Sequence, residues 1–211
     1  SASGCYSAAR VAALSGVPKS TVYGWARSGL IVPSVSSVRE KLWSYQDLLT
    51  LRAVYWLRKR KDTGLPGTER IPASPMNQVR AVLEQTINQG LDLWNDPSVQ
   101  IRIDLDGHIF FTQDDSARRD AFGQVSLDHA QSVDLLDAFG DSPGLVRPTE
   151  HVRIAPARLA GEPHLLRTRI GTQSLLALKE DGYPSSNIAR LYDIPVEQVE
   201  EALKYEWGLA A

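Results

Sequence analysis

Residues 7–27 read SAARVAALSGVPKSTVYGWAR, and this stretch decides how the first part of the chain folds. Small apolar residues recur at helical spacing as far as Leu14. Ser15-Gly16-Val17 then supplies a tight turn with an apolar residue to bury, and Pro18 is a residue type that often opens a helix. The order of helix, tight turn and helix predicts a helix-turn-helix.

The second helix of this motif has an outward face that is polar, small and cationic. On a helical wheel Val22, Trp25 and Ala26 turn toward the first helix, which leaves the other side free. Its first turn presents backbone N–H groups and the positive end of the helix dipole, where phosphate and base edges of a major groove are contacted. We predict DNA contacts from Lys19, Ser20, Thr21, Tyr23 and Arg27. A helical bundle whose Arg and Lys are merely solvated is the alternative.

Residues 31–45 extend the predicted DNA-binding surface. Their β-branched residues and Ser-rich tip predict a hairpin wing, whose Arg39 and Lys41 would meet flanking phosphates. Ser44 and Asp47 then have capping-box-like spacing at the start of another helix. Residues 1–61 hold ten Lys or Arg against two acidic residues, whereas the remainder holds thirteen against twenty-three. A basic segment beside an acidic one is typical of a nucleic-acid-binding module joined to another function.

Several short motifs mark this segment, namely Tyr6-Ser7-Ala8-Ala9, Val17-Pro18-Lys19-Ser20-Thr21-Val22, Trp43-Ser44 and Asp47-Leu48-Leu49-Thr50-Leu51-Arg52. On these motifs residues 1–61 resemble the winged helix-turn-helix domains of the MerR-like superfamily, and the resemblance implies DNA binding. Lys41 stands where the wing usually has arginine, and residues 62–74 form a linker where typical members begin a long dimerising helix. Cys5 is the single cysteine, so a thiolate metal sensor is not expected.

Residues 75–148 are expected to form a middle segment of mixed structure. Ser74 and Pro75 open an amphipathic helix of about five turns that reaches Trp94. Alternating apolar residues then predict a hairpin of residues 99–105 and 109–111, joined by Asp106-Gly107. The acidic connector that follows is predicted to contain one short helix near residues 127–139.

Residues 149–211 are expected to form a three-helix domain with a short strand pair. The strands are predicted at residues 152–154 and 165–169, and the helices at 172–180, 185–192 and from Pro195 to Trp207. The domain contains the short motifs Ile154-Ala155-Pro156, Gly161-Glu162-Pro163, Thr168-Arg169-Ile170, Leu175-Leu176, Asp181-Gly182-Tyr183, Ile188-Ala189, Tyr192-Asp193-Ile194 and Val199-Glu200-Glu201-Ala202-Leu203-Lys204-Tyr205. On these motifs it resembles the family catalogued as domain of unknown function 433. Arg167 departs from it, because the family prefers glycine there.

This second resemblance implies a VapB-type antitoxin, since such domains occur in antitoxins paired with PIN-type ribonuclease toxins. The last helix carries Glu197, Glu200, Glu201 and Glu206 against a single Lys204, and an acidic helix of this kind repels DNA. Its acidic face would suit a basic protein partner. The candidate partner-binding residues are Glu197, Glu200, Glu201 and Trp207. For any individual glutamate, simple solvation is an equally good interpretation.

The whole sequence predicts a mainly α fold with small β-hairpins. The predicted domains are a winged helix-turn-helix at 1–61, a linker at 62–74, a middle segment at 75–148 and a helix-turn-helix-like domain at 149–211. We expect a cytoplasmic homodimeric antitoxin that binds operator DNA and a PIN-type ribonuclease, with no catalytic site, metal or cofactor and no membrane segment. The alternative is a one-component transcriptional regulator with a ligand-sensing C-terminal region, where Trp94, Phe110 and Phe111 would line a pocket.

Overall fold

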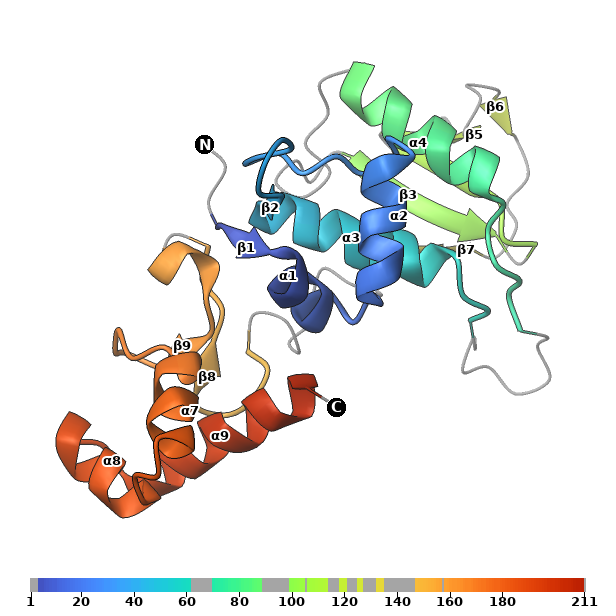
Figure 1. Ribbon diagram of the computed structural model, residues 1–211. Helices are drawn as coiled ribbons and strands as arrows, with labels where there is room; N and C mark the ends of the chain where they lie inside the picture. The colour runs from blue at the N-terminus through green and yellow to red at the C-terminus, as the bar shows by residue number, and fades with distance from the viewer. Residues whose placement is uncertain are drawn as a thin grey trace. The chain divides into compact units, whose positions relative to one another are not determined.

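The computed structural model describes residues 4–61, 70–88, 99–104, 106–113, 118–120, 125–126, 132–134, 147–156 and 158–210 (Figure 1). The chain forms two compact units. Unit 1 consists of residues 1–27, 31–49 and 143–211, and unit 2 of residues 28–30 and 50–142. Helices predominate, and the strands pair antiparallel, so the predicted mainly helical fold with small hairpins is confirmed.

The N-terminal part of unit 1 contains a helix-turn-helix and a wing. It is built from β1 (Tyr6–Ser7), α1 (Ala8–Ser15), α2 (Lys19–Arg27), β2 (Leu42–Trp43) and the first turn of α3 (Tyr45–Leu57). Strand β2 pairs with β1, opposing Tyr6 to Trp43 and Ser7 to Leu42. The wing is therefore joined to the start of the chain, a pairing that the sequence analysis did not predict.

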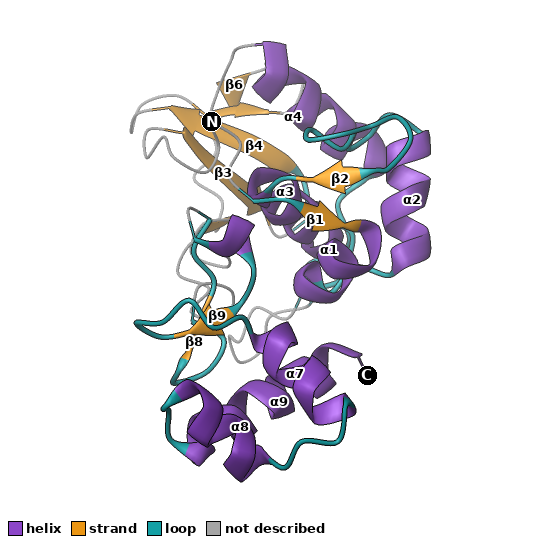
Figure 2. Ribbon diagram, turned by 60° about the vertical axis from the view of Figure 1, so that its left-hand side comes forward, coloured by secondary structure: helices purple, strands orange, loops and turns teal. Residues whose placement is uncertain are grey.

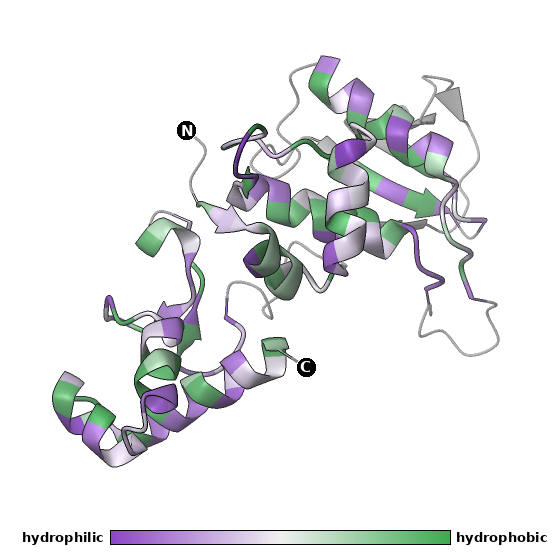
Figure 3. Ribbon diagram, viewed as in Figure 1, coloured by the Kyte–Doolittle hydropathy of each residue, from purple (hydrophilic) through white to green (hydrophobic). Residues whose placement is uncertain are grey.

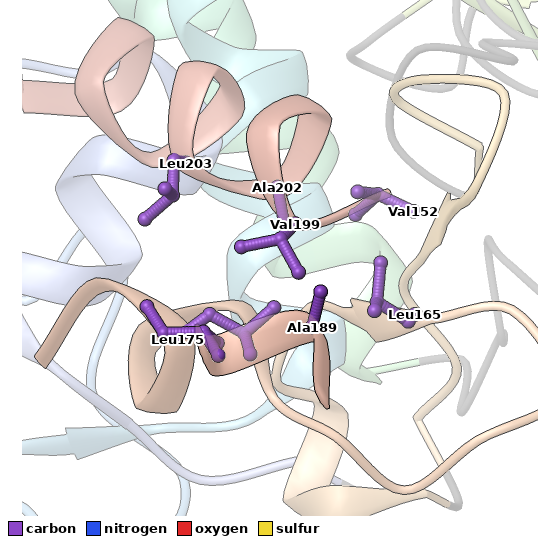
Figure 4. Close-up of a cluster of buried hydrophobic side chains, with 8 residues drawn as sticks. Val152, Leu165, Leu175, Ala189, Val199, Ala202 and Leu203 are labelled. Carbon is purple, nitrogen blue, oxygen red and sulfur yellow. The ribbon is translucent and has the colours of Figure 1, made fainter. Parts of the chain in front are cut away.

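The C-terminal part of unit 1 follows the predicted order closely. Its elements are β8 (Val152–Arg153), the 3-10 turn η1 (Leu159–Gly161), β9 (His164–Leu165), α7 (Thr172–Glu180), α8 (Ser185–Tyr192) and α9 (Val196–Ala210). Its core consists of Val152, Leu165, Leu175, Ile188, Ala189, Val199, Ala202 and Leu203 (Figure 4). Arg167 has a φ of +61°, so the turn at which the family prefers glycine forms here with arginine.

Unit 2 combines a five-stranded antiparallel sheet with a helix beside it and with residues 50–57 of α3 (Figure 2). The helix is α4 (Met76–Asn88), and the strands are β3 (Val99–Asp104), β4 (Ile109–Gln113), β5 (Arg118–Asp120), β6 (Val125–Ser126) and β7 (Ser132–Asp134), in the order β6-β5-β4-β3-β7. The Gln78 side chain of α4 accepts a hydrogen bond of 3.0 Å from the Ile109 backbone N–H. The core is apolar and includes Val79, Val82, Ile101, Ile103, Ile109 and Phe110.

Two predictions for unit 2 need correction. The hairpin of β3 and β4 is confirmed, with Ile103 opposite Ile109, but it is the centre of a larger sheet. The short helix predicted at 127–139 is wrong where the structure describes it, because residues 132–134 form β7 against β3. That pairing depends on a partner distant in sequence, which local periodicity does not indicate. Helix α4 is described as far as Asn88, and Trp94 lies outside the described residues.

Candidate nucleic-acid interface

The helix-turn-helix is held by caps at both ends of α1. The Ser7 hydroxyl accepts a hydrogen bond of 3.3 Å from the Arg10 N–H at the N-terminus. At the C-terminus Gly16 has a φ of +70°, a conformation that glycine adopts without steric cost. The Val17 N–H then donates to the Ala12 carbonyl over 3.2 Å, and its side chain is buried. These contacts fix the direction in which α2 leaves the turn.

Helix α2 buries one residue and leaves its polar face in solvent. Val22 is completely buried and anchors the helix. Of the predicted DNA contacts, Thr21 is half-buried, while the other four on this helix are exposed, namely Lys19, Ser20, Tyr23 and Arg27. The helix contains two cations and no acidic residue, so its outward face has the sign of charge that a phosphate backbone requires.

The wing brings one of its two predicted cations, Lys41, beside α2. Lys41 is half-buried, and its Nζ lies 5.9 Å from the centre of the Tyr23 ring. The Tyr23 ring in turn meets buried Trp43 edge to face, with ring centres 6.2 Å apart. Arg39 is exposed at the tip. The structure thus places Lys41 and Tyr23 together as one surface and holds them against a buried aromatic residue.

A single carboxylate closes the wing onto α3. Asp47 accepts hydrogen bonds from the Ser44 N–H (2.8 Å), the Ser34 N–H (2.9 Å) and the Ser34 hydroxyl (2.7 Å). The Asp47 N–H donates to the Ser44 hydroxyl over 3.1 Å, which completes the predicted capping box. The two ends of the wing are therefore tied to the same helix start.

Residues 58–61 are four consecutive cations, and Lys61 differs from the other three because it is buried. Its side chain is 6% exposed, and its Nζ donates to the carbonyls of Leu57 and Lys59, each over 3.1 Å. Burial, with a smaller effect of Arg58, lowers the Lys61 pKa to about 8. Arg58, Lys59 and Arg60 remain exposed and carry the charge of this helix end.

Helix α9 presents an acidic face, with one correction to the predicted set. Glu197 and Glu200 are exposed, and Trp207 is 53% exposed. The ribbon of this C-terminal helix carries both hydrophilic and hydrophobic residues along its length (Figure 3). Glu201 is half-buried. One of its carboxylate oxygens accepts a hydrogen bond of 2.7 Å from the His151 backbone N–H, and the other lies 2.6 Å from the Nδ1 atom of the His151 ring. Burial opposes ionisation of Glu201, but these hydrogen bonds and one from Thr149 lower its pKa overall.

Glu206 is not part of this acidic face. It lies on the opposite side of α9 and is 4% exposed, because it pairs with the buried guanidinium of Arg10. Sequence reasoning missed both residues of this pair. Their signal was present in α1, where Arg10 lies one helical turn before buried Leu14 and so belongs to the apolar side of the helix.

Other candidate sites have structural explanations. Asp104, Asp106 and His108 bring metal-ligand atoms within 4.8 Å of one another, but Asp104 already accepts hydrogen bonds from the backbone N–H groups of the other two residues and so shapes the β3–β4 turn. Phe110, expected to line a pocket in the ligand-sensing alternative, is buried in the unit 2 core. Trp94 and the side chain of Phe111 lie outside the described part of the chain. Across the described residues, every helix is too short or too polar to serve as a membrane span.

Comparisons with known proteins match the N-terminal and C-terminal parts of the chain to two different families. Among curated proteins, none matches the chain significantly. The X-ray crystal structure of Rv2018 from Mycobacterium tuberculosis has a similar fold, with a TM-score of 0.51 and 15% sequence identity over 94% of this chain and 96% of that one. Residues 6–71 match the MerR HTH family of regulatory proteins, and residues 152–205 match DUF433, a family of proteins of unknown function. The chain therefore carries a MerR-family helix-turn-helix region, which indicates a DNA-binding regulator, followed by a C-terminal DUF433 region.

Proposed function

We propose that the chain is a VapB-type antitoxin that binds operator DNA as a homodimer, represses its own operon in the cytoplasm and neutralises a PIN-type ribonuclease. The observation that carries this proposal is the opposite charge of two outward helix faces. Helix α2 exposes Lys19 and Arg27 and contains no acidic residue, whereas α9 exposes Glu197 and Glu200. A cationic face suits nucleic acid, and an acidic one repels it and suits a basic protein.

On the DNA side, α2 would enter the major groove. Lys19, Arg27, Arg39 and Lys41 supply contacts to phosphate or guanine, and Ser20, Thr21 and Tyr23 supply hydrogen bonds. A homodimer presents two such helices, so its operator is a near-palindrome with half-sites separated by about one helical turn, or a multiple of it.

The DNA contact is tested by comparing Arg27→Gln with Lys204→Gln. Both residues are exposed cations on the second helix of a helix-turn-helix, one in α2 and one in α9. We expect Arg27→Gln to weaken binding to a duplex taken from upstream of the chain's own gene and to lower the slope of log affinity against log salt by about one unit. Fluorescence anisotropy over a range of salt concentrations measures both. Equal behaviour of the two variants would contradict the assignment of α2.

On the protein side, the exposed part of α9 would face a ribonuclease that binds RNA with basic residues. An acidic surface speeds association with such a partner and competes with its RNA substrate. Trp207 adds a large exposed aromatic side chain to the same helix, the residue type that most often anchors a protein interface.

The partner is sought in the reading frame next to the gene. We expect the purified chain to inhibit RNA cleavage by a nuclease encoded there, and Glu197→Lys with Glu200→Lys to weaken this inhibition at least tenfold. Glu180→Lys, an exposed acid on α7, is the control and should inhibit normally. If the neighbouring gene encodes no nuclease, or the chain leaves its activity unchanged, the antitoxin role is refuted while the DNA-binding role stands.

A further inference from the structure

The first strand and helix of the helix-turn-helix contact the DUF433 region at a continuous set of points within unit 1. The Cys5 N–H donates to the Ala160 carbonyl over 2.9 Å. The buried hydroxyl of Tyr6 donates to the Gly161 carbonyl over 2.8 Å. A turn of the C-terminal region, residues 159–162, therefore lies directly against β1.

Arg10 extends this contact into a buried ionic network. Its Nε donates to Glu162 over 2.7 Å, and its two terminal nitrogens donate to the two carboxylate oxygens of Glu206 over 2.8 and 2.9 Å. Thr172 of α7 donates to the same carboxylate. Burial works against the guanidinium charge, but hydrogen bonding and attraction to Glu206 and Glu162 raise the Arg10 pKa above its ordinary value. A bidentate pair of this kind fixes the orientation of both side chains.

The backbone of the 159–162 turn is shaped for this contact. Leu159 and Ala160 have φ values of +48° and +52°, which residues with a Cβ adopt only when their surroundings hold them there. Gly161 has a φ of +85°, and a Cβ added to it would overlap the Tyr6 hydroxyl. The turn is thus held in an unfavourable conformation at the place where it receives Tyr6.

The other edge of β1 holds the wing. Tyr6 and Ser7 pair with Trp43 and Leu42 of β2. Leu42 also exchanges hydrogen bonds with Ser36 across the wing, its N–H donating over 2.8 Å and its carbonyl accepting over 3.1 Å. Strand β1 therefore lies between the DUF433 region on one side and, on the other, strand β2, which directly follows Lys41 in the wing.

We propose that the C-terminal region, which comprises the DUF433 match and Glu206, positions the DNA-binding module, and that Tyr6, Arg10 and Glu206 are the positioning residues. They hold β1 in place, and β1 holds β2, so the placement of the wing cations depends on a region far away in the sequence. The part of this inference that concerns DNA rests on the proposed function. The part that concerns the wing itself does not.

The test is hydrogen exchange in the full chain carrying Tyr6→Phe and Glu206→Gln. These changes remove one hydroxyl and one charge without altering the shape of either side chain. We expect the amides of Ser36 and Leu42 to exchange about tenfold faster, while those of Val22 in α2 and Ile188 in α8 keep their rates. Tyr183→Phe with Glu180→Gln makes the same chemical changes at exposed positions and should leave all four rates unchanged.

The outcomes separate this inference from the proposed function. Unchanged exchange at Ser36 and Leu42 would overturn it, and so would equal acceleration of all four amides, which is the mark of a general loss of stability. Selective acceleration in a chain that binds no upstream DNA would support the inference and refute the proposed function. If the chain binds the upstream DNA, we expect the Tyr6→Phe, Glu206→Gln variant to lower the slope of log affinity against log salt concentration by about one unit. An unchanged slope would overturn the link between the wing and DNA.

Discussion

The two helix-turn-helix motifs of unit 1 share the lengths of their first helix and turn but differ in the charge of their exposed surfaces. Helix α1 spans residues 8–15 and α8 spans 185–192, and in each case the next helix begins four residues later, at Lys19 or Val196. The turn hydrogen bond also recurs, from Val17 to Ala12 in the first motif and from Ile194 to Ala189 in the second, over 3.2 and 3.0 Å.

Equivalent positions on the second helices differ where they face solvent. Val22 and Val199 are both completely buried, so the anchor is shared. The exposed positions pair Ser20 with Glu197, Tyr23 with Glu200 and Arg27 with Lys204. The comparison teaches that the turn and the anchor residue are shared between the motifs while the outward residues differ, and under the proposed function these outward residues set the partner of each motif.

The largest expected difference between the motifs concerns their first helices. Leu14 is 5% exposed, whereas its equivalent Leu191 is 64% exposed. We expect Leu14→Ala to lower the free energy of unfolding by about 2–5 kcal/mol, because it removes a buried side chain and leaves a cavity. Leu191→Ala should change it by less than about 0.5 kcal/mol. Urea unfolding of the full chain measures both, and similar losses would show that the motifs bury the same positions.

The turns should differ by a smaller amount. Gly16 has a φ of +70° with open space around it, so Gly16→Ala should cost about 1 kcal/mol through backbone conformation alone. Its equivalent Asp193 has a φ of +53°, a region that aspartate tolerates, and Asp193→Gly should change stability by less than about 0.5 kcal/mol. The midpoints of urea denaturation give both values. A loss at Gly16 no larger than the change at Asp193 would contradict the left-handed assignment of the first turn.

The smallest difference is a dependence on pH confined to the second motif. Glu201 occupies the position of Gly24, and its hydrogen bonds from His151 and Thr149 lower its pKa below the ordinary value. Because its folded pKa is lower than its unfolded one, its contribution to stability is complete above the unfolded pKa and is lost as pH falls through the folded pKa. Glu201→Gln should remove this acid dependence. Thermal unfolding of both forms from pH 6 to pH 3 measures it, and parallel profiles would contradict the role of the carboxylate.

Local features of the sequence predicted most of unit 1. The tight turn at Gly16, the capping box of Ser44 and Asp47, and the three C-terminal helices depend on neighbours within a few residues, which periodicity and turn chemistry detect. The exposed positions of α2 followed from the same helical wheel. The correspondence between the two turns is also visible in the sequence, because Gly-Val-Pro at 16–18 and Asp-Ile-Pro at 193–195 occupy the same place between two helices.

The features that were missed depend on partners far apart in sequence. Strand β7 joins the sheet by pairing with β3, about 30 residues earlier in the chain. Strand β1, at residues 6–7, pairs with β2 of the wing at residues 42–43. Glu206 was assigned to the acidic face because its charge is typical of an exposed residue, and only its contact with Arg10, 196 residues away, explains its burial. Such pairing leaves no periodic signal in either segment.

The buried pair of Arg10 and Glu206 restricts how the two ends of this chain can be recombined. A hybrid that took residues 1–61 from a regulator with alanine at position 10 would enclose the Glu206 carboxylate without a counter-ion, at a cost of about 3–5 kcal/mol. A hybrid with a foreign C-terminal end would leave the guanidinium equally isolated. The two regions must therefore be inherited, or transplanted, as a matched set.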